Sequence, residues 1–234
     1  MCFDQCPSEY KSRYVDGVAL ELSEALVFGS SVHRALEAHY QGADAERAFL
    51  AAWRTESKLL PRVSPNLTGI GLDLLDKVIA LDLRGVPERG FSLDMELLIG
   101  APIVGAIDLW GDGVIYDFKT TRGVWSAERA QTETWQPVIY TQAYFQEVGE
   151  WPDFEYIVLN RVTGQLDRFR REWTIDSWAA QWSDAYGRMR QIAALVEAGD
   201  FACPRMHGYC PECGERWGHA HVCELTNTSR RIKL

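Results

Sequence analysis

The sequence lacks the apolar runs of a membrane protein, because no stretch approaches the ~20 consecutive apolar residues that a membrane-spanning helix needs. Its first residues, Met-Cys-Phe-Asp-Gln-Cys-Pro, also lack the basic and apolar segments of a secretory signal. We therefore expect a cytoplasmic protein without a membrane span. With 234 residues, 47% of them hydrophobic, the chain is long enough for one domain with a substantial core.

The chain also lacks positive charge overall, with a formal net charge of −9. Because contacts with nucleic-acid phosphates need lysine and arginine, this average alone argues against nucleic-acid binding. The basic residues nevertheless gather in two patches, Arg161, Arg168, Arg170 and Arg171 in one, and Arg230, Arg231 and Lys233 in the other. Such patches are compatible with a DNA enzyme whose carboxylates hold a metal, although each patch is equally typical of solvated surface charge.

Cysteine is absent from the whole middle of the chain. The six cysteines are Cys2, Cys6, Cys203, Cys210, Cys213 and Cys223. A cytoplasmic chain rarely uses disulfides, so clustered cysteines indicate a metal site, and Cys210-Pro-Glu-Cys213 is a C-x₂-C pair. The three thiolates of Cys210, Cys213 and Cys223 then need a fourth ligand.

Two kinds of metal site compete for these cysteines. A tetrahedral zinc could be completed within the tail by Cys203, His219 or His221. A [4Fe–4S] cluster also takes four thiolates, and its fourth could come from Cys6 or Cys2 at the N-terminus. Free cysteines without a metal are the plain alternative, and the C-x₂-C spacing disfavours it.

The order of the expected elements predicts the fold class. Apolar spacing predicts helices over 32–40, 44–58, 70–83, 127–147 and 176–198, and strands over 91–99, 102–110, 113–120, 154–161 and 165–172. Ser30 or Ser31 could cap the first helix, Pro137 should kink the fourth or mark its first turn, and Gly199 ends the last. This order is typical of an α/β or α+β protein with a small mixed sheet flanked by helices, and we expect the α/β class.

The most informative stretch is a hairpin within residues 102–120. Asp112-Gly113 is the dipeptide favoured in a two-residue type I′ turn, in which both central residues have positive φ. Counting outward from this turn places Asp108 opposite Asp117, and alternation along the strand puts Lys119 on the same face as Asp117.

Two opposed aspartates need a positive charge between them. Cross-strand neighbours lie about 5 Å apart, where two carboxylates repel by roughly 3 kcal/mol at an effective dielectric constant near 20. Lys119 supplies one positive charge, and Mg²⁺ or Mn²⁺, which prefer carboxylate and water oxygens, would supply the rest. The plain alternative is a surface ion cluster on an ordinary hairpin. Glu96 is a further candidate acid, although a solvent-facing glutamate is the simpler interpretation.

Six short motifs along the chain are similar to those of a known family. They are Cys6-Pro-Ser-Glu-Tyr10, Gly29-Ser-Ser-Val-His33, Val104-Gly-Ala-Ile-Asp108, Asp117-Phe-Lys-Thr120, Gln136-Pro-Val-Ile-Tyr140, and the three cysteines of the tail. In this order they resemble the RecB-like branch of the PD-(D/E)XK nucleases, over nearly the full length. The similarity is greatest to members with an iron–sulfur cluster, namely the nucleases of CRISPR spacer acquisition, the AddB-type nuclease domain and related phage exonucleases. Pro137 and the long spacing from Cys213 to Cys223 depart from the family pattern.

The resemblance implies a role for each residue of these motifs. It implies a restriction-endonuclease-like core in which Mg²⁺ or Mn²⁺ is bound by His33, Asp108, Asp117 and the backbone carbonyl of Phe118. Lys119 would orient and help deprotonate the attacking water, and Gln136 and Tyr140 would hold DNA or water nearby. Cys6, Cys210, Cys213 and Cys223 would bind a [4Fe–4S] cluster, with Cys2 or Cys203 as replacement ligands.

The resemblance also implies an activity. We expect a metal-dependent DNA nuclease of prokaryotic or phage type, an exonuclease acting on single-stranded ends. It would form one domain over 1–234, with an N-terminal segment 1–28, a nuclease core 29–200 and a cysteine-rich tail 201–234. Two alternatives stay open, namely a zinc-ribbon nucleic-acid-binding or adaptor protein without catalysis, and a nuclease subunit active only within a helicase or CRISPR-adaptation complex.

Overall fold

The computed structural model describes residues 7–17, 22–94, 102–132 and 135–201. These belong to two compact units, one formed by 1–21, 98–100 and 186–234, and the other by 22–97 and 101–185. All six cysteines, Glu96, His219, His221 and the basic residues of the tail lie outside the described residues. The metal site predicted from the cysteines, and the predicted single domain, therefore remain predictions.

In the unit formed by 1–21, 98–100 and 186–234, the described chain is short. It contains the helix α2 (Pro7–Tyr10), the π-helical turn η1 (Lys11–Val15) and the second half of the helix α9 (Ile175–Glu197). The rings of Tyr10 and Phe201 stack with their centroids 6.4 Å apart. Within the described ranges, no helix is both long and apolar enough to cross a membrane.

The other unit contains the sheet and begins with the helix α3 (Glu24–Tyr40). The hydroxyl of Ser23 caps this helix by accepting a hydrogen bond of 3.2 Å from the backbone N–H of Leu26. The predicted caps Ser30 and Ser31 are therefore wrong, since both lie inside the helix, where Ser31 Oγ donates to the Val27 carbonyl at 2.8 Å. The apolar face begins a full turn earlier than predicted, because Val27 and Phe28 are also buried.

Two further helices pack against α3 and form one part of the core. They are α4 (Ala45–Glu56) and α5 (Leu67–Ile79), and the 3₁₀ turn η2 (Ser57–Leu59) follows α4. Phe28 of α3 meets Phe49 and Trp53 of α4 edge to face, with ring centroids 6.2 and 5.9 Å apart. Phe118 of the sheet joins the same cluster, so this helical layer is fixed to the strand that carries Asp117 and Lys119.

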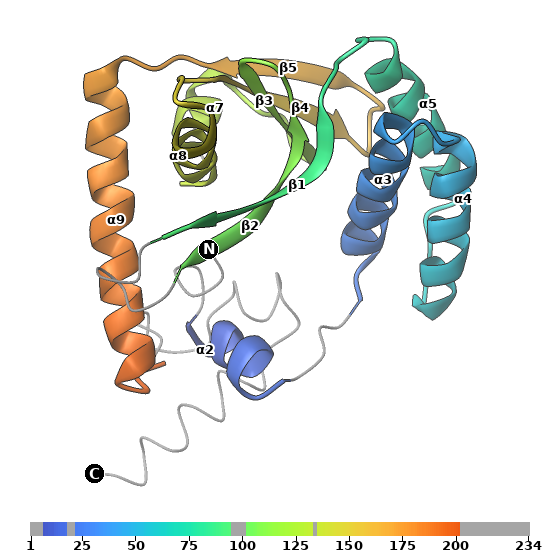
Figure 1. The fold of residues 1–234 in the computed structure, drawn as a ribbon. Coiled ribbons are helices and arrows are strands. Elements are labelled where there is room, and N and C mark those ends of the chain that lie inside the picture. Colours follow the sequence, from blue (N-terminus) through green and yellow to red (C-terminus); the bar gives the residue numbers. More distant parts are fainter. Residues whose placement is uncertain (1–6, 18–21, 95–101, 133–134, 202–234) are drawn as a thin grey trace, which may run out of the picture. The chain divides into compact units, whose positions relative to one another are not determined.

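The sheet has five strands in the order of the sequence (Figure 1). They are β1 (Val86–Leu93), β2 (Ile103–Trp110), β3 (Val114–Thr121), β4 (Asp153–Asn160) and β5 (Leu166–Arg171). Neighbouring strands are antiparallel except for β3 and β4, which are parallel, so the predicted small mixed sheet is confirmed. The first strand begins at Val86 and not at residue 91 as predicted.

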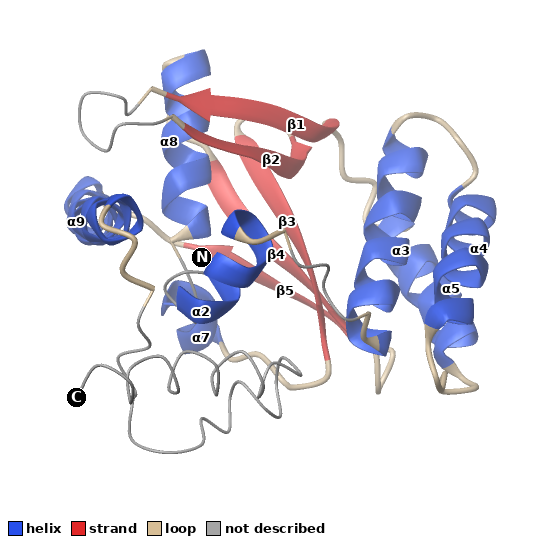
Figure 2. Ribbon diagram, turned by 90° about the horizontal axis from the view of Figure 1, so that it is seen from below, coloured by secondary structure: helices blue, strands red, loops and turns tan. Residues whose placement is uncertain are grey.

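The parallel pair is joined by two helices, α7 (Ala127–Thr132) and α8 (Gln136–Val148), where one helix over 127–147 was predicted. Pro137 lies in the first turn of α8, one of its two predicted positions, because a helix start does not need its missing N–H. Phe118 packs toward α3, whereas its neighbour Lys119 reaches Gln136 of α8. The helices α3–α5 and α7–α8 therefore cover opposite faces of the sheet (Figure 2).

Candidate active site

The hairpin of β2 and β3 has the predicted register. Trp110 pairs with Ile115 and Leu109 with Tyr116, and the Gly111 N–H donates to the Val114 carbonyl at 2.8 Å. The predicted type I′ turn is wrong, however, because only Gly113 has a positive φ, at 68°, and Asp112 does not. A side chain from α8 supports this turn, since the Tyr144 hydroxyl accepts a hydrogen bond of 2.8 Å from the Gly113 N–H.

Backbone pairing of the two strands stops one step before the two aspartates. Leu109–Tyr116 is the last pair, so Asp108 and Asp117 do not form a ladder pair. Instead, the carboxylate of Asp108 accepts a hydrogen bond of 2.7 Å from the Phe118 N–H. The strands separate where two opposed carboxylates would repel, and a backbone donor stabilises one of the two charges.

Asp117 is fully buried beside Lys119. Lys119 Nζ lies 2.5 Å from Asp117 Oδ2, and apart from this ion pair neither carboxylate oxygen has a hydrogen-bond partner. Burial raises the pKa of Asp117 to about 6, although the positive charge of Lys119 acts in the opposite direction. Burial alone would lower the pKa of Lys119, but Asp117 and Asp108 raise it above its usual value. A buried carboxylate with unused lone pairs is costly unless a further cation shares it.

His33 projects from α3 toward Asp108. Its Nδ1 lies 3.5 Å from Asp108 Oδ1, and its ring meets that of Phe118 edge to face. Gly29 allows this approach, because a Cβ at its position would lie only 2.9 Å from the hydroxyl of Thr120 on β3. Burial lowers the pKa of His33, but the hydrogen bond and the charge of Asp108 outweigh it, so that the net pKa is raised.

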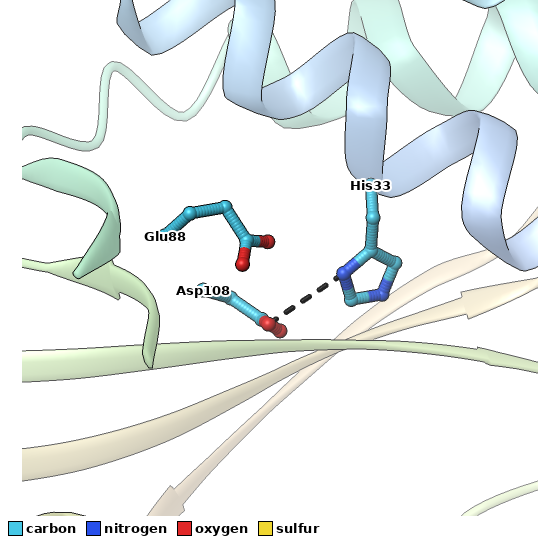
Figure 3. A group of neighbouring side chains, drawn as sticks. All are labelled: His33, Glu88 and Asp108. Atoms are coloured by element: carbon cyan, nitrogen blue, oxygen red, sulfur yellow. Dashed lines mark ion pairs between the residues drawn. The ribbon is translucent and has the colours of Figure 1, made fainter. Parts of the chain in front are cut away.

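Glu88 of β1 joins this group, although sequence reasoning missed it. The ligand atoms of His33, Glu88 and Asp108 all lie within 4.8 Å of one another (Figure 3). Burial raises the pKa of Glu88, and Asp108 raises it further. The pairs Pro87–Leu109 and Arg89–Ile107 on either side place Glu88 opposite Asp108 on the neighbouring strand.

The backbone at Glu88 is strained, since its φ is 47° within a strand. Glycine adopts such a conformation freely, whereas a glutamate there needs support from its surroundings. A strand predicted to begin at Val86 instead of residue 91 would have revealed Glu88 by counting across from Asp108. The positive φ leaves no signal in the sequence.

The predicted residues on the other face form a continuous chain of contacts. Lys119 Nζ donates to Gln136 Oε1 at 2.8 Å, and Gln136 Nε2 donates to the Tyr140 hydroxyl at 2.7 Å. Gln136 lies at the start of α8, and Tyr140 follows it by one helical turn. Burial raises the pKa of Tyr140 to about 12, so the phenol stays neutral at physiological pH.

The structure thus brings together the side chains of His33, Asp108, Asp117, Lys119, Gln136 and Tyr140, as predicted, with Glu88 added. Two groups meet near Asp108, one formed by His33, Glu88 and Asp108, and the other by Asp117, Lys119, Gln136 and Tyr140. For Phe118 the described contact is its N–H with Asp108, so the ligand role of its carbonyl stays a prediction. Nitrogen and carboxylate oxygen donors in such an arrangement suit a hard divalent cation beside a lysine.

Comparison of the sequence with models of protein families identifies the family of this chain. The model of the PD-(D/E)XK nuclease superfamily matches residues 1–223. The chain belongs to this superfamily. As a PD-(D/E)XK protein it is a nuclease, and hence a hydrolase of phosphodiester bonds. Nucleases of this superfamily generally use Mg²⁺ or Mn²⁺.

Comparison with solved structures supports the fold. A candidate exonuclease from Eubacterium rectale matches with a TM-score of 0.59 at 15% identity, over 82% of this chain and 75% of that one. The protein SSO0001 matches over 88% of this chain and 90% of its own at 12% identity, but its TM-score of 0.35 is too low to indicate a shared fold. None of the curated proteins matches the sequence significantly. Membership of the iron–sulfur branch remains a prediction.

Proposed function

We propose that this PD-(D/E)XK protein is a metal-dependent deoxyribonuclease, an exonuclease acting on the single-stranded ends of DNA in the cytoplasm. One observation carries the proposal. The ligand atoms of His33, Glu88 and Asp108 lie within 4.8 Å of one another. The strand β3, which neighbours the strand of Asp108, carries the buried ion pair of Asp117 and Lys119. This arrangement combines a cation site with a fixed positive charge, and both stabilise the charge that develops during phosphodiester hydrolysis.

The donor set fits Mg²⁺ or Mn²⁺. Carboxylate oxygens suit both ions, and the imidazole of His33 slightly favours Mn²⁺ because it is the softer ligand. Apart from the ion pair with Lys119, the oxygens of Asp117 have no hydrogen-bond partner that would compete with a metal. The chemistry that such an ion supplies when bound is activation of a water and polarisation of the scissile phosphodiester.

The side chains around this site hold the substrate and the water. Lys119 is fixed between Asp117 and Gln136, so its ammonium group can orient the attacking water and offset charge on the phosphate. The neutral phenol of Tyr140 adds a donor one helical turn along α8. The hydrogen bond from the Phe118 N–H keeps Asp108 oriented toward His33. These groups are preorganised by the sheet and by α8, which keeps the cost of reorganisation low.

The structure does not favour a purely structural role for the acidic cluster. A surface ion cluster would keep its carboxylates solvated, whereas Asp117 is fully buried and has no hydrogen-bond partner apart from its ion pair with Lys119. An assay on end-labelled single- and double-stranded DNA, with Mn²⁺ and with EDTA, tests the proposal. Progressive shortening of single strands from an end is expected with Mn²⁺ and none with EDTA, whereas cleavage that persists in EDTA would contradict it.

We also propose that Cys6, Cys210, Cys213 and Cys223 bind a structural [4Fe–4S] cluster. The support is the cysteine spacing and its resemblance to the iron–sulfur branch of the family. A zinc ion on the tail cysteines is the competing assignment. A partner in recombination, helicase or CRISPR-adaptation assemblies would follow from the same resemblance, and co-purification from the native source would test it.

A further inference from the structure

A cavity of about 560 Å³ lies apart from the metal-ligating residues, where β4 begins and where β5 leads into α9. Its walls include three tryptophans and two arginines, Trp151, Trp173, Trp178, Arg170 and Arg171, and we call it the tryptophan cavity. All of these residues belong to the unit that contains the sheet. The volume falls within the range of pockets that hold small ligands.

Arg171 is the unusual residue of this cavity. Its side chain is only 2% exposed, and its Nε and Nη1 atoms have no hydrogen-bond partner. Its Nη2 donates to the amide oxygen of Gln181, and its guanidinium carbon lies 4.6 Å from the centre of the Trp173 ring. Burial lowers the pKa of Arg171, with only the Tyr156 hydroxyl acting in the opposite direction. A buried guanidinium without an ion pair lacks the anion that normally compensates such a charge.

The neighbouring arginines differ in this respect. Arg168 forms a two-pronged ion pair with Glu155 at 2.6 and 2.9 Å, and Arg170 pairs with Asp153. Two acids line the cavity: Asp153 is neutralised by Arg170, and the exposed Glu172 also acts on Arg170. Among the residues that the structure describes, Arg171 makes no ion pair, which leaves its charge available to a ligand.

Two indole N–H groups add to the donors of Arg171. The Nε1 atoms of Trp173 and Trp178 are both buried and without a hydrogen-bond partner, and Trp178 is 9% exposed. An indole N–H and a guanidinium can only donate, so the unpaired groups of this cavity call for an acceptor with several oxygens. A phosphate group has that chemistry, and arginine is well suited to it.

Trp151 supplies an aromatic surface at the same cavity. It is 42% exposed, stacks on Phe145 with ring centroids 4.4 Å apart, and meets Trp178 at 4.5 Å. An indole that is packed against other aromatic rings and remains partly exposed to solvent can serve as a stacking surface for a nucleobase. We propose that the tryptophan cavity binds one nucleotide of a single DNA strand, with its phosphate on Arg171 and its base on Trp151.

The register of the sheet relates this cavity to the active site. Asp117 pairs with Tyr156 on β4, and Phe154, two residues earlier, pairs with Arg171 on β5. Arg171 is two strands away from Asp117, at ~4.8 Å per strand, and two residues away along the strand direction, at ~3.3 Å per residue. The two residues are therefore about 12 Å apart, on the same face of the sheet. Tyr156 lies between them, with Lys119 Nζ 5.9 Å from its ring. The inference rests on the proposed function in one respect, since the nuclease substrate supplies the bound strand.

Binding of a fluorescent thymidine oligonucleotide in EDTA, followed by anisotropy, tests the inference without cleavage. Arg171→Met removes the charge at nearly constant volume, and Trp151→Leu removes the platform. Each is expected to weaken binding about tenfold, in line with the contribution of one stacked base or one charge-assisted phosphate contact. Arg84→Gln is the matched control, since its side chain is 86% exposed and its loss should change affinity less than about twofold.

The outcomes separate this inference from the proposed function. If the wild type binds the oligonucleotide and the variants bind it weakly, the cavity inference holds even when no Mn²⁺-dependent cleavage is found. If the wild type cleaves and both folded variants bind and cleave as it does, the inference is overturned. If Arg171→Met does not fold, an unchanged affinity of Trp151→Leu for the oligonucleotide is sufficient to overturn the inference. Equal competition by poly-glutamate would show an anion site without base recognition and would also overturn it.

Discussion

The backbone N–H of Phe118 donates a hydrogen bond of 2.7 Å to the carboxylate of Asp108, across the point where β2 and β3 stop pairing. Phe118 lies between Asp117 and Lys119, so this one bond sets the position of Asp108 relative to both. It also leaves the other oxygen of Asp108 directed at His33, whose Nδ1 is 3.5 Å away. The opening of the hairpin therefore lets the backbone of β3 hold Asp108 within the group that it forms with His33 and Glu88.

Glu88→Gln tests the residue that joins the predicted ligands. The change removes one carboxylate from the group of His33, Glu88 and Asp108 while keeping its size. We expect Mn²⁺ affinity to fall at least about tenfold, and activity to be restored at higher Mn²⁺ concentration. Titration calorimetry measures the affinity, with the solvent-exposed Glu46→Gln as control. Unchanged affinity in Glu88→Gln would exclude Glu88 from the site.

Gln136→Ala tests how Lys119 is positioned. The substitution removes the acceptor that holds Lys119 Nζ at 2.8 Å and the donor to Tyr140, but no proposed metal ligand. We expect kcat to fall about 10- to 100-fold while Mn²⁺ affinity stays the same, because a misplaced charge costs transition-state stabilisation only. Steady-state kinetics check this, with the exposed Gln165→Ala as control. A loss of metal affinity instead would show that Gln136 supports the ligands.

The pH dependence of metal binding follows from the carboxyl of Asp117 and the imidazole of His33. Burial raises the pKa of Asp117 to about 6, and Asp108 makes the pKa of His33 higher than usual. A metal must displace protons from both groups, so Mn²⁺ affinity should rise with pH between about 5 and 8 and binding should release protons. Calorimetry in buffers of different ionisation enthalpy counts the protons. An affinity that does not change over this range would contradict this account of the site.

The cysteine prediction is tested by colour and metal content. Anaerobically purified protein should be brown, with broad visible absorption and about four irons per chain. Cys210→Ser should lose this absorption, whereas a colourless protein with one zinc would favour the zinc assignment. Because the cysteines lie outside the described residues, the metal analysis decides this point by itself.

Local chemistry made much of this fold predictable from the sequence. The Asp112-Gly113 dipeptide gave the register of the pairs nearest the turn, and the first turn of a helix is one of the two positions predicted for Pro137. Features that depend on tertiary packing were missed. The conformation of Glu88, with φ of 47°, depends on its surroundings, and Asp108 accepts a hydrogen bond from the Phe118 N–H instead of pairing with Asp117.

The electrostatic environment was the least predictable part. Arg171 belongs to a run of arginines that the sequence presents as equal, yet strand alternation leaves Arg168 and Arg170 in ion pairs and Arg171 buried. The burial of Asp117 was likewise not evident, since an aspartate in a hairpin is more often exposed. Alternation along a strand shows which residues share a face, but the sequence does not show which face a helix covers, and burial depends on that.

The central claim is that Asp117 and Lys119 form a metal-dependent catalytic pair, and cleavage of end-labelled single-stranded DNA with Mn²⁺ tests it most directly. Asp117→Asn and Lys119→Ala should each reduce the rate at least about 100-fold, with circular dichroism unchanged. Asp112→Asn, at the exposed turn of the same hairpin, should keep full activity. Full EDTA-sensitive activity in pure Asp117→Asn or Lys119→Ala would contradict the account.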